Sequence, residues 1–325
     1  MQPLSFLPCS RNQNTKAMNR YAVIDIGTNT CNLLIANALN NGTFEPVYDR
    51  KLPVKLGRGG IHKDILLPDA TERGLKALSH HSVTIKEFEA TKVKVVGTSA
   101  IRGATNKGDF LAKVKHLLGW DIEILDGELE AELIFRGVRL SLPNGTGKYL
   151  IVDIGGGSIE FILANDNQII WKNSFNIGIA RVLEKFPVSD PISYEEIRSI
   201  EEWFDEQLKE LWFITNVHCP ETLVGCSGAF DTFMDIYEKE TPDLKIRGIS
   251  ELPVKDFLGI HNQLISTSQE ARSQMEGMDI SRVEMIVIAS VFTNLILRRL
   301  SIKRLIHTHN ALKEGVMDRF ISMEL

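Results

Sequence analysis

The sequence has few cysteines and no long apolar run. Its four cysteines, in 325 residues, form neither a Cys-x-x-Cys pair nor the dense spacing of a disulfide framework, so we expect reduced thiols and a cytoplasmic protein. No apolar stretch reaches the roughly 18 residues of a membrane-spanning helix, and the first residues lack the basic and apolar regions of a secretory signal. No membrane association is expected.

The sequence also lacks an excess of positive charge. Its 37 basic residues are outnumbered by 42 acidic ones, which gives a formal net charge of −5 and argues against nucleic acid as a partner. A hydrophobic fraction of 43% and a charged fraction of 24% are ordinary for a globular protein and exclude a disordered or fibrous chain. The length corresponds to about two domains.

Strand-like and helical runs alternate from Tyr21 onward, which predicts an α/β architecture. A stretch rich in proline and glycine at 141–147 interrupts the alternation. In the second half, residues 193–212 and residues 255–272 are each predicted to form one helix. The predicted units are a disordered leader at 1–19, a first domain at 20–140 joined by a C-terminal helix at 309–325, a hinge at 141–147 and a second domain at 148–308.

Two segments of the chain resemble each other. Residues 23–37, VIDIGTNTCNLLIAN, align with residues 151–165, IVDIGGGSIEFILAN. In each copy an apolar strand ends in an aspartate, and a turn of small and polar residues leads into a second apolar strand. The repeat predicts two duplicated domains, each with such a hairpin.

The turns of both hairpins suit a phosphate group. Glycine allows the backbone to approach a ligand closely, and clustered N–H groups and hydroxyls donate to phosphate oxygens. Because a purely structural turn need not repeat its hydroxyls, two copies favour a polyphosphate held from both sides. The predicted phosphate-binding residues of the hairpins are Gly27, Thr28, Asn29, Thr30, Gly155, Gly156, Gly157 and Ser158. A P-loop and a dinucleotide-binding glycine motif are both missing from the sequence.

Carboxylates in the hairpins suit a divalent cation. Asp153 ends one strand and Glu160 lies on the return strand, so the hairpin can bring both together. Oxygen ligands of this kind hold Mg²⁺, Mn²⁺ or Ca²⁺. Glu160 stands where the first copy has Asn32, and an acid in one copy only favours a metal site over a surface position. Asp25 is the weaker third candidate, with a water between it and the metal.

Other candidate residues follow predicted strands. Arg102 carries a guanidinium, which suits phosphate, although a surface position is the alternative. Ser227 and Gly228 open a predicted helix whose N-terminus can hold an anion, and Cys226 before them is interpreted as a packing residue. The segment His307-Thr308-His309-Asn310 lacks a third metal ligand and is interpreted as a capping turn near the site.

Beyond these motifs, the chain resembles a known family. Its DIGTNT and DIGGGS loops are similar to those of the actin, sugar kinase and heat-shock chaperone ATPase superfamily. Four further segments, GTSAIR at 97–102, DGELEAE at 126–132, GCSG at 225–228 and LKEG at 312–315, resemble the exopolyphosphatase and guanosine pentaphosphate phosphatase family. The resemblance extends from about Tyr21 to Phe320 and implies two duplicated ribonuclease H-like (actin-like ATPase) domains around a cleft, in a short form of the family.

The resemblance also implies roles for single residues. It makes Glu130 the catalytic base, whereas Glu128 and Glu132 are interpreted as acids that complement the helix macrodipole. It supports Asp153 and Glu160 as metal ligands. Many relatives carry arginine where this chain has Glu132, which leaves the preferred substrate open.

We therefore expect a divalent-cation-dependent phosphohydrolase, with Mg²⁺ as the first choice of metal, that removes the terminal phosphate of inorganic polyphosphate or guanosine pentaphosphate. The alternatives are an alarmone- or nucleotide-binding regulatory protein with little turnover and an ATP-dependent kinase. The expected partner is the substrate, and a homodimer is the other association to test. Lys51, Lys55 and Arg58 are expected to flank the cleft, and the hinge is expected to let it open and close.

Overall fold

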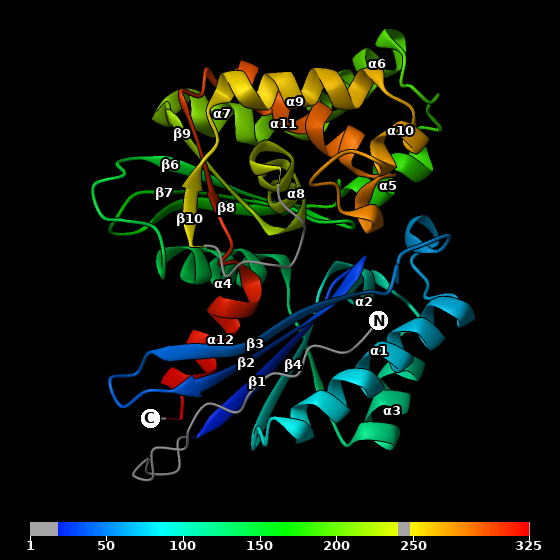
Figure 1. Ribbon diagram of the computed structural model, residues 1–325, viewed down its shortest axis with the longest axis vertical. Helices are drawn as coiled ribbons and strands as arrows, with labels where there is room; N and C mark the ends of the chain where they lie inside the picture. The colour runs from blue at the N-terminus through cyan, green and yellow to red at the C-terminus, as the bar shows by residue number, and fades with distance from the viewer. Residues whose placement is uncertain (1–18, 240–247, 325) are drawn as a thin grey trace, which may run out of the picture.

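The computed structural model describes residues 19–239 and 248–324, so the predicted leader lies outside it except for its last residue. Two sheets lie one above the other, with helices on their outer faces and between them (Figure 1). None of the helices in these two ranges is both long and apolar enough to cross a membrane.

The first sheet has five strands in the order β3-β2-β1-β4-β5. Strand β1 pairs antiparallel with β2, and β2 with β3, while β4 and β5 extend the sheet in parallel. Apolar side chains on one face of this sheet pack with helices α1 and α3 in one core. The elements of this half are β1 (Arg20–Ile26), β2 (Thr30–Ala38), β3 (Phe44–Pro53), η1 (Ile61–Lys63), α1 (Pro68–Glu87), β4 (Lys92–Gly97), α2 (Ser99–Gly103), α3 (Lys107–Leu118), β5 (Ile122–Ile124) and α4 (Gly127–Arg139).

The second sheet has six strands in the order β10-β11-β9-β6-β7-β8. Its strands β8-β7-β6-β9-β11 repeat the order and the directions of the first sheet, with β6 antiparallel to β7 and parallel to β9. This repetition confirms the predicted fold of two duplicated ribonuclease H-like α/β domains. The strands are β6 (Tyr149–Ile154), β7 (Ile159–Ala164), β8 (Ile169–Phe175), β9 (Thr222–Cys226), β10 (Ile249–Glu251) and β11 (Arg304–Thr308).

Helices cover the outer face of the second sheet, and two of the predicted helices are each split. The segment 193–212 breaks at Leu208, and Phe204, Leu208 and Leu211 on the two sides of the break are buried in the same core. The segment 255–272 breaks before Ser268, whose hydroxyl accepts a hydrogen bond from the backbone of the next helix. The remaining helices of the chain are α5 (Ile179–Lys185), α6 (Tyr194–Gln207), α7 (Lys209–His218), α8 (Ser227–Glu238), α9 (Val254–Ser266), α10 (Gln269–Ser273), η2 (Ile280–Arg282) and α11 (Ile286–Leu300), together with α12 (Leu312–Ser322), which lies between the sheets.

Helices α4 and α12 form a layer between the two sheets, and one apolar core joins them to both inner faces. The two helices touch at glycines: a Cβ on Gly137 would lie 1.9 Å from the carbonyl oxygen of Ala311, and one on Gly315 would lie 1.8 Å from that of Leu133. Side chains at these positions would push the helices apart. Helix α4 packs on β7 and β8 of the second sheet. The domain boundary predicted at residue 140 therefore lies between α4 and β6, whose side chains pack in the same core.

Candidate active site

The turns of the two repeated hairpins meet between the sheets. A Cβ on Gly156 would lie 2.2 Å from the side-chain nitrogen of Asn29, and one on Gly157 would lie 2.6 Å from the hydroxyl of Thr28. A side chain at either position would have to displace the polar side chain that faces it. The sequence predicted that the two turns hold one ligand between them. In the fold the two turns lie against each other, as that prediction requires.

A cavity of about 130 Å³ lies between these turns. Every residue predicted for the site lines it, with the exception of Arg102. The predicted residues in its lining are Asp25, Gly27, Thr28, Asn29, Thr30, Glu130, Asp153, Gly155, Gly156, Gly157, Ser158, Glu160, Ser227 and Gly228. The roles given to them by the sequence stay predictions.

On the first sheet, Asp25 of β1 lies directly opposite Asn32 of β2. Residues opposite each other in an antiparallel pair point to the same face, and the Asn32 amide donates to one oxygen of Asp25 at 2.8 Å. The other oxygen of Asp25 is buried without a partner among the described residues. Burial raises the pKa of Asp25 to about 6, although Asn32 and Lys313 lower it.

On the second sheet, Asp153 of β6 lies directly opposite Glu160 of β7. Both carboxylates are buried; the hydroxyl of Ser227 donates to Asp153 at 2.7 Å, and that of Ser174 donates to Glu160 at 2.7 Å. Burial, together with the charge of Glu160, raises the pKa of Asp153 to about 8. The pKa of Glu160 is raised by burial as well, so the surface position considered for this residue is wrong.

These carboxylates fit a hard divalent cation. Charged oxygens held close together in a buried site repel one another, and a cation would remove that repulsion. In the part of the chain that the structure describes, no three acidic, histidine or cysteine side chains are arranged to hold a metal by themselves. A cation bound to Asp153 and Glu160 would therefore complete its coordination with water and phosphate oxygens, as Mg²⁺ commonly does.

Glu130 reaches the cavity from the first turn of α4. The helix begins there because the side chain of Asp126 accepts a hydrogen bond from the backbone N–H of Leu129 at 2.8 Å. The Glu130 side chain is buried, and Arg102 donates to its carboxylate at 2.6 Å. Burial and the charge of Glu160 raise the pKa of Glu130 well above its ordinary value, against the opposing effect of Arg102.

Arg102 lies on α2, beside the cavity and outside its lining. Its guanidinium donates to Glu130 and, at 3.0 Å, to the carbonyl oxygen of Leu125, and its side chain is 22% exposed. The surface position considered for this residue is therefore wrong, and its predicted contact with phosphate stays a prediction. The contact with Glu130 joins segments 28 residues apart in sequence, which a motif search cannot detect.

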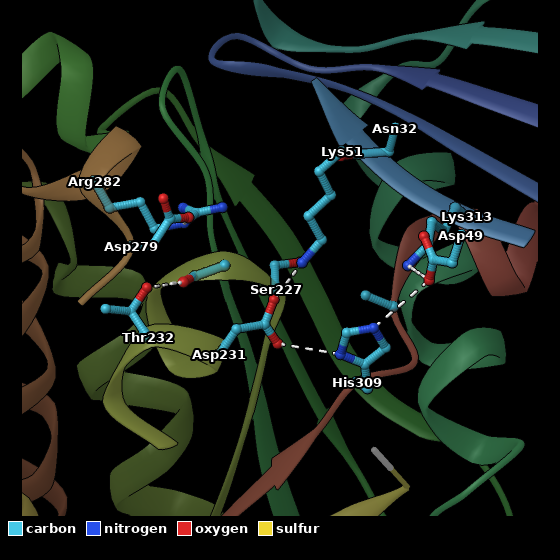
Figure 2. A network of polar contacts seen from close by, with 12 residues as sticks. Asn32, Asp49, Lys51, Ser227, Asp231, Thr232, Asp279, Arg282, His309 and Lys313 are labelled. Carbon is cyan, nitrogen blue, oxygen red and sulfur yellow. Dashed lines mark hydrogen bonds and ion pairs between the residues drawn. The ribbon is translucent and has the colours of Figure 1, made fainter. Parts of the chain in front are cut away.

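Sequence reasoning missed a network that joins β3, α8 and the segment before α12 (Figure 2). Lys51 of β3 forms an ion pair with Asp231 of α8. His309 lies between two aspartates, with its ring nitrogens 3.5 Å from Asp231 and 3.6 Å from Asp49. Lys313 of α12 contacts Asp49 at 3.1 Å. Of the three basic residues expected beside the cleft, Lys51 alone lines the cavity; Lys55 pairs with Glu284 and Arg58 is exposed.

The capping turn predicted at 307–310 is only partly observed. Thr308 accepts a hydrogen bond from the backbone of Asn310 at 3.2 Å, as a capping residue does. The two histidines contact Asp231 instead, with His307 at 2.9 Å. Cys226 is fully buried, and burial raises the pKa of its thiol well above the ordinary value, so it packs as predicted.

Known proteins are similar to this chain in sequence and in fold. A model of the Ppx/GppA phosphatase family matches residues 34–324. Exopolyphosphatase 2 of Mycobacterium tuberculosis is 29% identical over 83% of this chain and 87% of its own length. The crystal structure of an exopolyphosphatase from Cytophaga hutchinsonii has a TM-score of 0.89 at 36% identity and covers 94% of this chain and 98% of its own. The Aquifex aeolicus member of the Ppx/GppA family has a TM-score of 0.77 at 26% identity, with 94% and 99% covered.

Proposed function

The chain belongs to the Ppx/GppA phosphatase family, and from that premise we propose that it is a divalent-cation-dependent hydrolase that removes the terminal phosphate of inorganic polyphosphate. Two similar proteins, from Mycobacterium tuberculosis and Cytophaga hutchinsonii, are named exopolyphosphatases, which supports this substrate. Guanosine pentaphosphate also ends in a phosphoanhydride-linked phosphate and is the second substrate to test.

One observation carries the proposal: a buried carboxylate with a raised pKa, Glu130, faces a cavity between two glycine-rich turns. A raised pKa makes this carboxylate a stronger base than an ordinary glutamate. Glu130 accepts a proton from a water that attacks the terminal phosphorus. The bond from that phosphorus to the bridging oxygen breaks, the oxygen stays with the shortened chain, and orthophosphate is released.

The other residues of the site position the substrate and neutralise its charge. The N–H groups and hydroxyls of the turns, among them Thr28 and Ser158, donate to the oxygens of the terminal phosphoryl group. Arg102 holds the Glu130 carboxylate in place. A divalent cation on Asp153 and Glu160, with Asp25 reached through a water, would supply further neutralisation of the charge on the phosphoryl group.

The test measures phosphate release from short polyphosphate, long polyphosphate, guanosine pentaphosphate and ATP in the presence of Mg²⁺. We expect release from polyphosphate, and we expect Glu130→Gln to lower kcat by about 100- to 10,000-fold, the range for a general base. Glu128→Gln is the matched control, because Glu128 lies in the same helical turn and is exposed. Binding of polyphosphate without release, or equal rates for wild type and Glu130→Gln, would reject the proposal.

The two alternatives give different results in the same assay. A kinase would consume ATP faster when a phosphate acceptor is added. A regulatory protein would bind guanosine pentaphosphate tightly, and its low rate of turnover would not respond to Glu130→Gln.

A further inference from the structure

One wall of the cavity carries positive charge. In the part of the chain that the structure describes, the lining includes Lys51, His309 and Lys313, and its other basic residue, Arg282, pairs with Asp279 at 3.2 Å. The acids that pair with these three side chains, Asp49, Asp231 and Glu314, are absent from that lining. These three cations therefore face the cavity, whereas their acidic partners lie behind them, outside the cavity lining.

His309 and Lys313 are held firmly in this wall. His309 contacts acids on both of its ring nitrogens, and Lys313 contacts Asp49 and Glu314 at 3.1 Å and 2.8 Å. Burial alone would lower the pKa of His309, but its aspartate partners raise it to about 9, so the ring is protonated at neutral pH. Both side chains thus present a fixed positive charge to the cavity.

Lys51 differs because it has room to move. It lies on β3 directly opposite Asn32, in line with the site residues of β1 and β2, and its long side chain reaches toward α8 of the other half (Figure 2). Its side chain is 28% exposed, against 7% for that of Lys313. Asp231, the acid it pairs with, keeps its contacts to His307 and His309 if the lysine leaves.

A phosphate chain has the complementary chemistry. Each internal phosphoryl group carries a negatively charged oxygen, and an ammonium group binds such an oxygen as a point charge. With the terminal phosphoryl between the hairpin turns, the groups behind it need compensating charge that the turns themselves do not carry. The wall beside the turns supplies it.

We propose that Lys51, His309 and Lys313 form a subsite for the internal phosphoryl groups of a phosphate chain, and that Lys51 exchanges Asp231 for a phosphate oxygen when the chain binds. The proposal rests on the function proposed above and adds the part of the substrate that these residues recognise. It makes the binding of a chain of several phosphates stronger than that of a single phosphate.

The experiment measures binding by calorimetry in the Glu130→Gln background, with tripolyphosphate and orthophosphate as ligands at fixed Mg²⁺ and salt concentrations. We expect Lys51→Met to weaken tripolyphosphate binding by about 10-fold or more, the loss of one charge-assisted contact, and orthophosphate binding by less than about 2-fold. Lys51→Arg keeps the charge and recovers most of the affinity. Lys55→Met is the matched control, since Lys55 pairs with Glu284 at 3.2 Å outside the cavity lining and should leave both affinities unchanged.

Unchanged tripolyphosphate binding in Lys51→Met, or equal weakening for both ligands, would overturn the proposal. If that variant does not fold, as judged by its thermal unfolding, His309→Gln takes its place with the same expected discrimination. Phosphate release by the wild type is measured in parallel. No release together with intact discrimination between the two ligands would reject the hydrolase and leave the subsite in place.

Discussion

The two sheets present corresponding rows of side chains to the cleft, and the rows differ in charge. In both rows the first strand carries an aspartate. The second strand carries an amide in the first sheet and an acid in the second sheet, and the third strand carries an amine and a hydroxyl, respectively. The rows are Asp25, Asn32 and Lys51 on β1, β2 and β3, and Asp153, Glu160 and Ser174 on β6, β7 and β8.

This difference shows how the two halves of a duplicated fold can suit different parts of one bound complex, the cation and the anionic ligand. Backbone pairing keeps equivalent positions in equivalent places, because register sets which side chains point to the same face. The second row has become a pair of buried acids, which suits a cation. The first row keeps one acid, neutralised by an amide and followed by a lysine, which suits the anionic ligand.

The largest expected effect comes from replacing the acid of the second row with the amide that the first row carries at the same position. We expect Glu160→Asn to lower kcat by about 100- to 1,000-fold, because a cation lost from the site removes several kcal/mol of charge neutralisation in the transition state. Raising the Mg²⁺ concentration should restore part of the rate. Phosphate release across a Mg²⁺ titration measures both. Glu210→Gln is the control, since Glu210 is an exposed acid that contacts the neighbouring β8. A normal Mg²⁺ requirement in Glu160→Asn would contradict the division between the rows.

A second test compares the two aspartates that occupy the same position in the repeat. Asp25→Asn should cost about 10-fold in kcat/KM, and Asp153→Asn about 100-fold, because the proposed cation would be bound by Asp153 together with a second carboxylate, whereas Asp25 lies beside an amide. The same assay measures both variants. Equal losses would mean that the two rows contribute equally to the metal site.

The smallest expected effect concerns stability, and it tests the network at the outer end of the first row. The pKa of His309 is raised from 6.5 to about 9 by its two aspartate partners, against burial and the nearby Lys313. The folded protein therefore binds this proton more tightly than the unfolded chain does. The resulting stability is fully present below about pH 6.5 and is lost as the pH rises through about 9.

We accordingly expect the Tm of the wild type to fall more steeply between pH 7 and pH 9 than that of His309→Gln, in the absence of ligand. Thermal unfolding followed by circular dichroism measures both slopes. His116→Gln, which changes an exposed histidine on α3, should keep the wild-type slope. Parallel curves for wild type and His309→Gln would show that the network adds no pH-dependent stability.

Much of the fold was predictable because its signals are local. The apolar runs of the central strands and the repeated hairpin predicted two duplicated halves, and the register of β1 with β2 and of β6 with β7 agrees with that alignment. The break of the segment 193–212 at Leu208 was not predictable. Phe204, Leu208 and Leu211 follow the spacing of one continuous helix face, so the apolar pattern carries no signal of the break.

The residues of the site, too, were predictable only where they lie close together in the sequence. Asp153 and Glu160 are seven positions apart in one hairpin, so a short turn brings them together and sequence spacing reveals them. The pairing of Glu160 with Ser174 needs the next strand, and no motif marks that serine. The contact between Lys51 and Asp231 joins residues 180 positions apart, and nothing in either segment refers to the other.

By itself, the sequence determined the two hairpins, the carboxylates and small residues in them, and the charged start of the helix that carries Glu130, because each depends on neighbours a few positions away. Only the tertiary structure decided that Arg102 holds Glu130, that two glycines let α4 and α12 touch, and that Lys51, His309 and Lys313 line one cavity whose lining excludes their acidic partners. These contacts arise where two sheets and the helical layer between them meet, and burial there sets both the charges and the distances on which the chemistry depends.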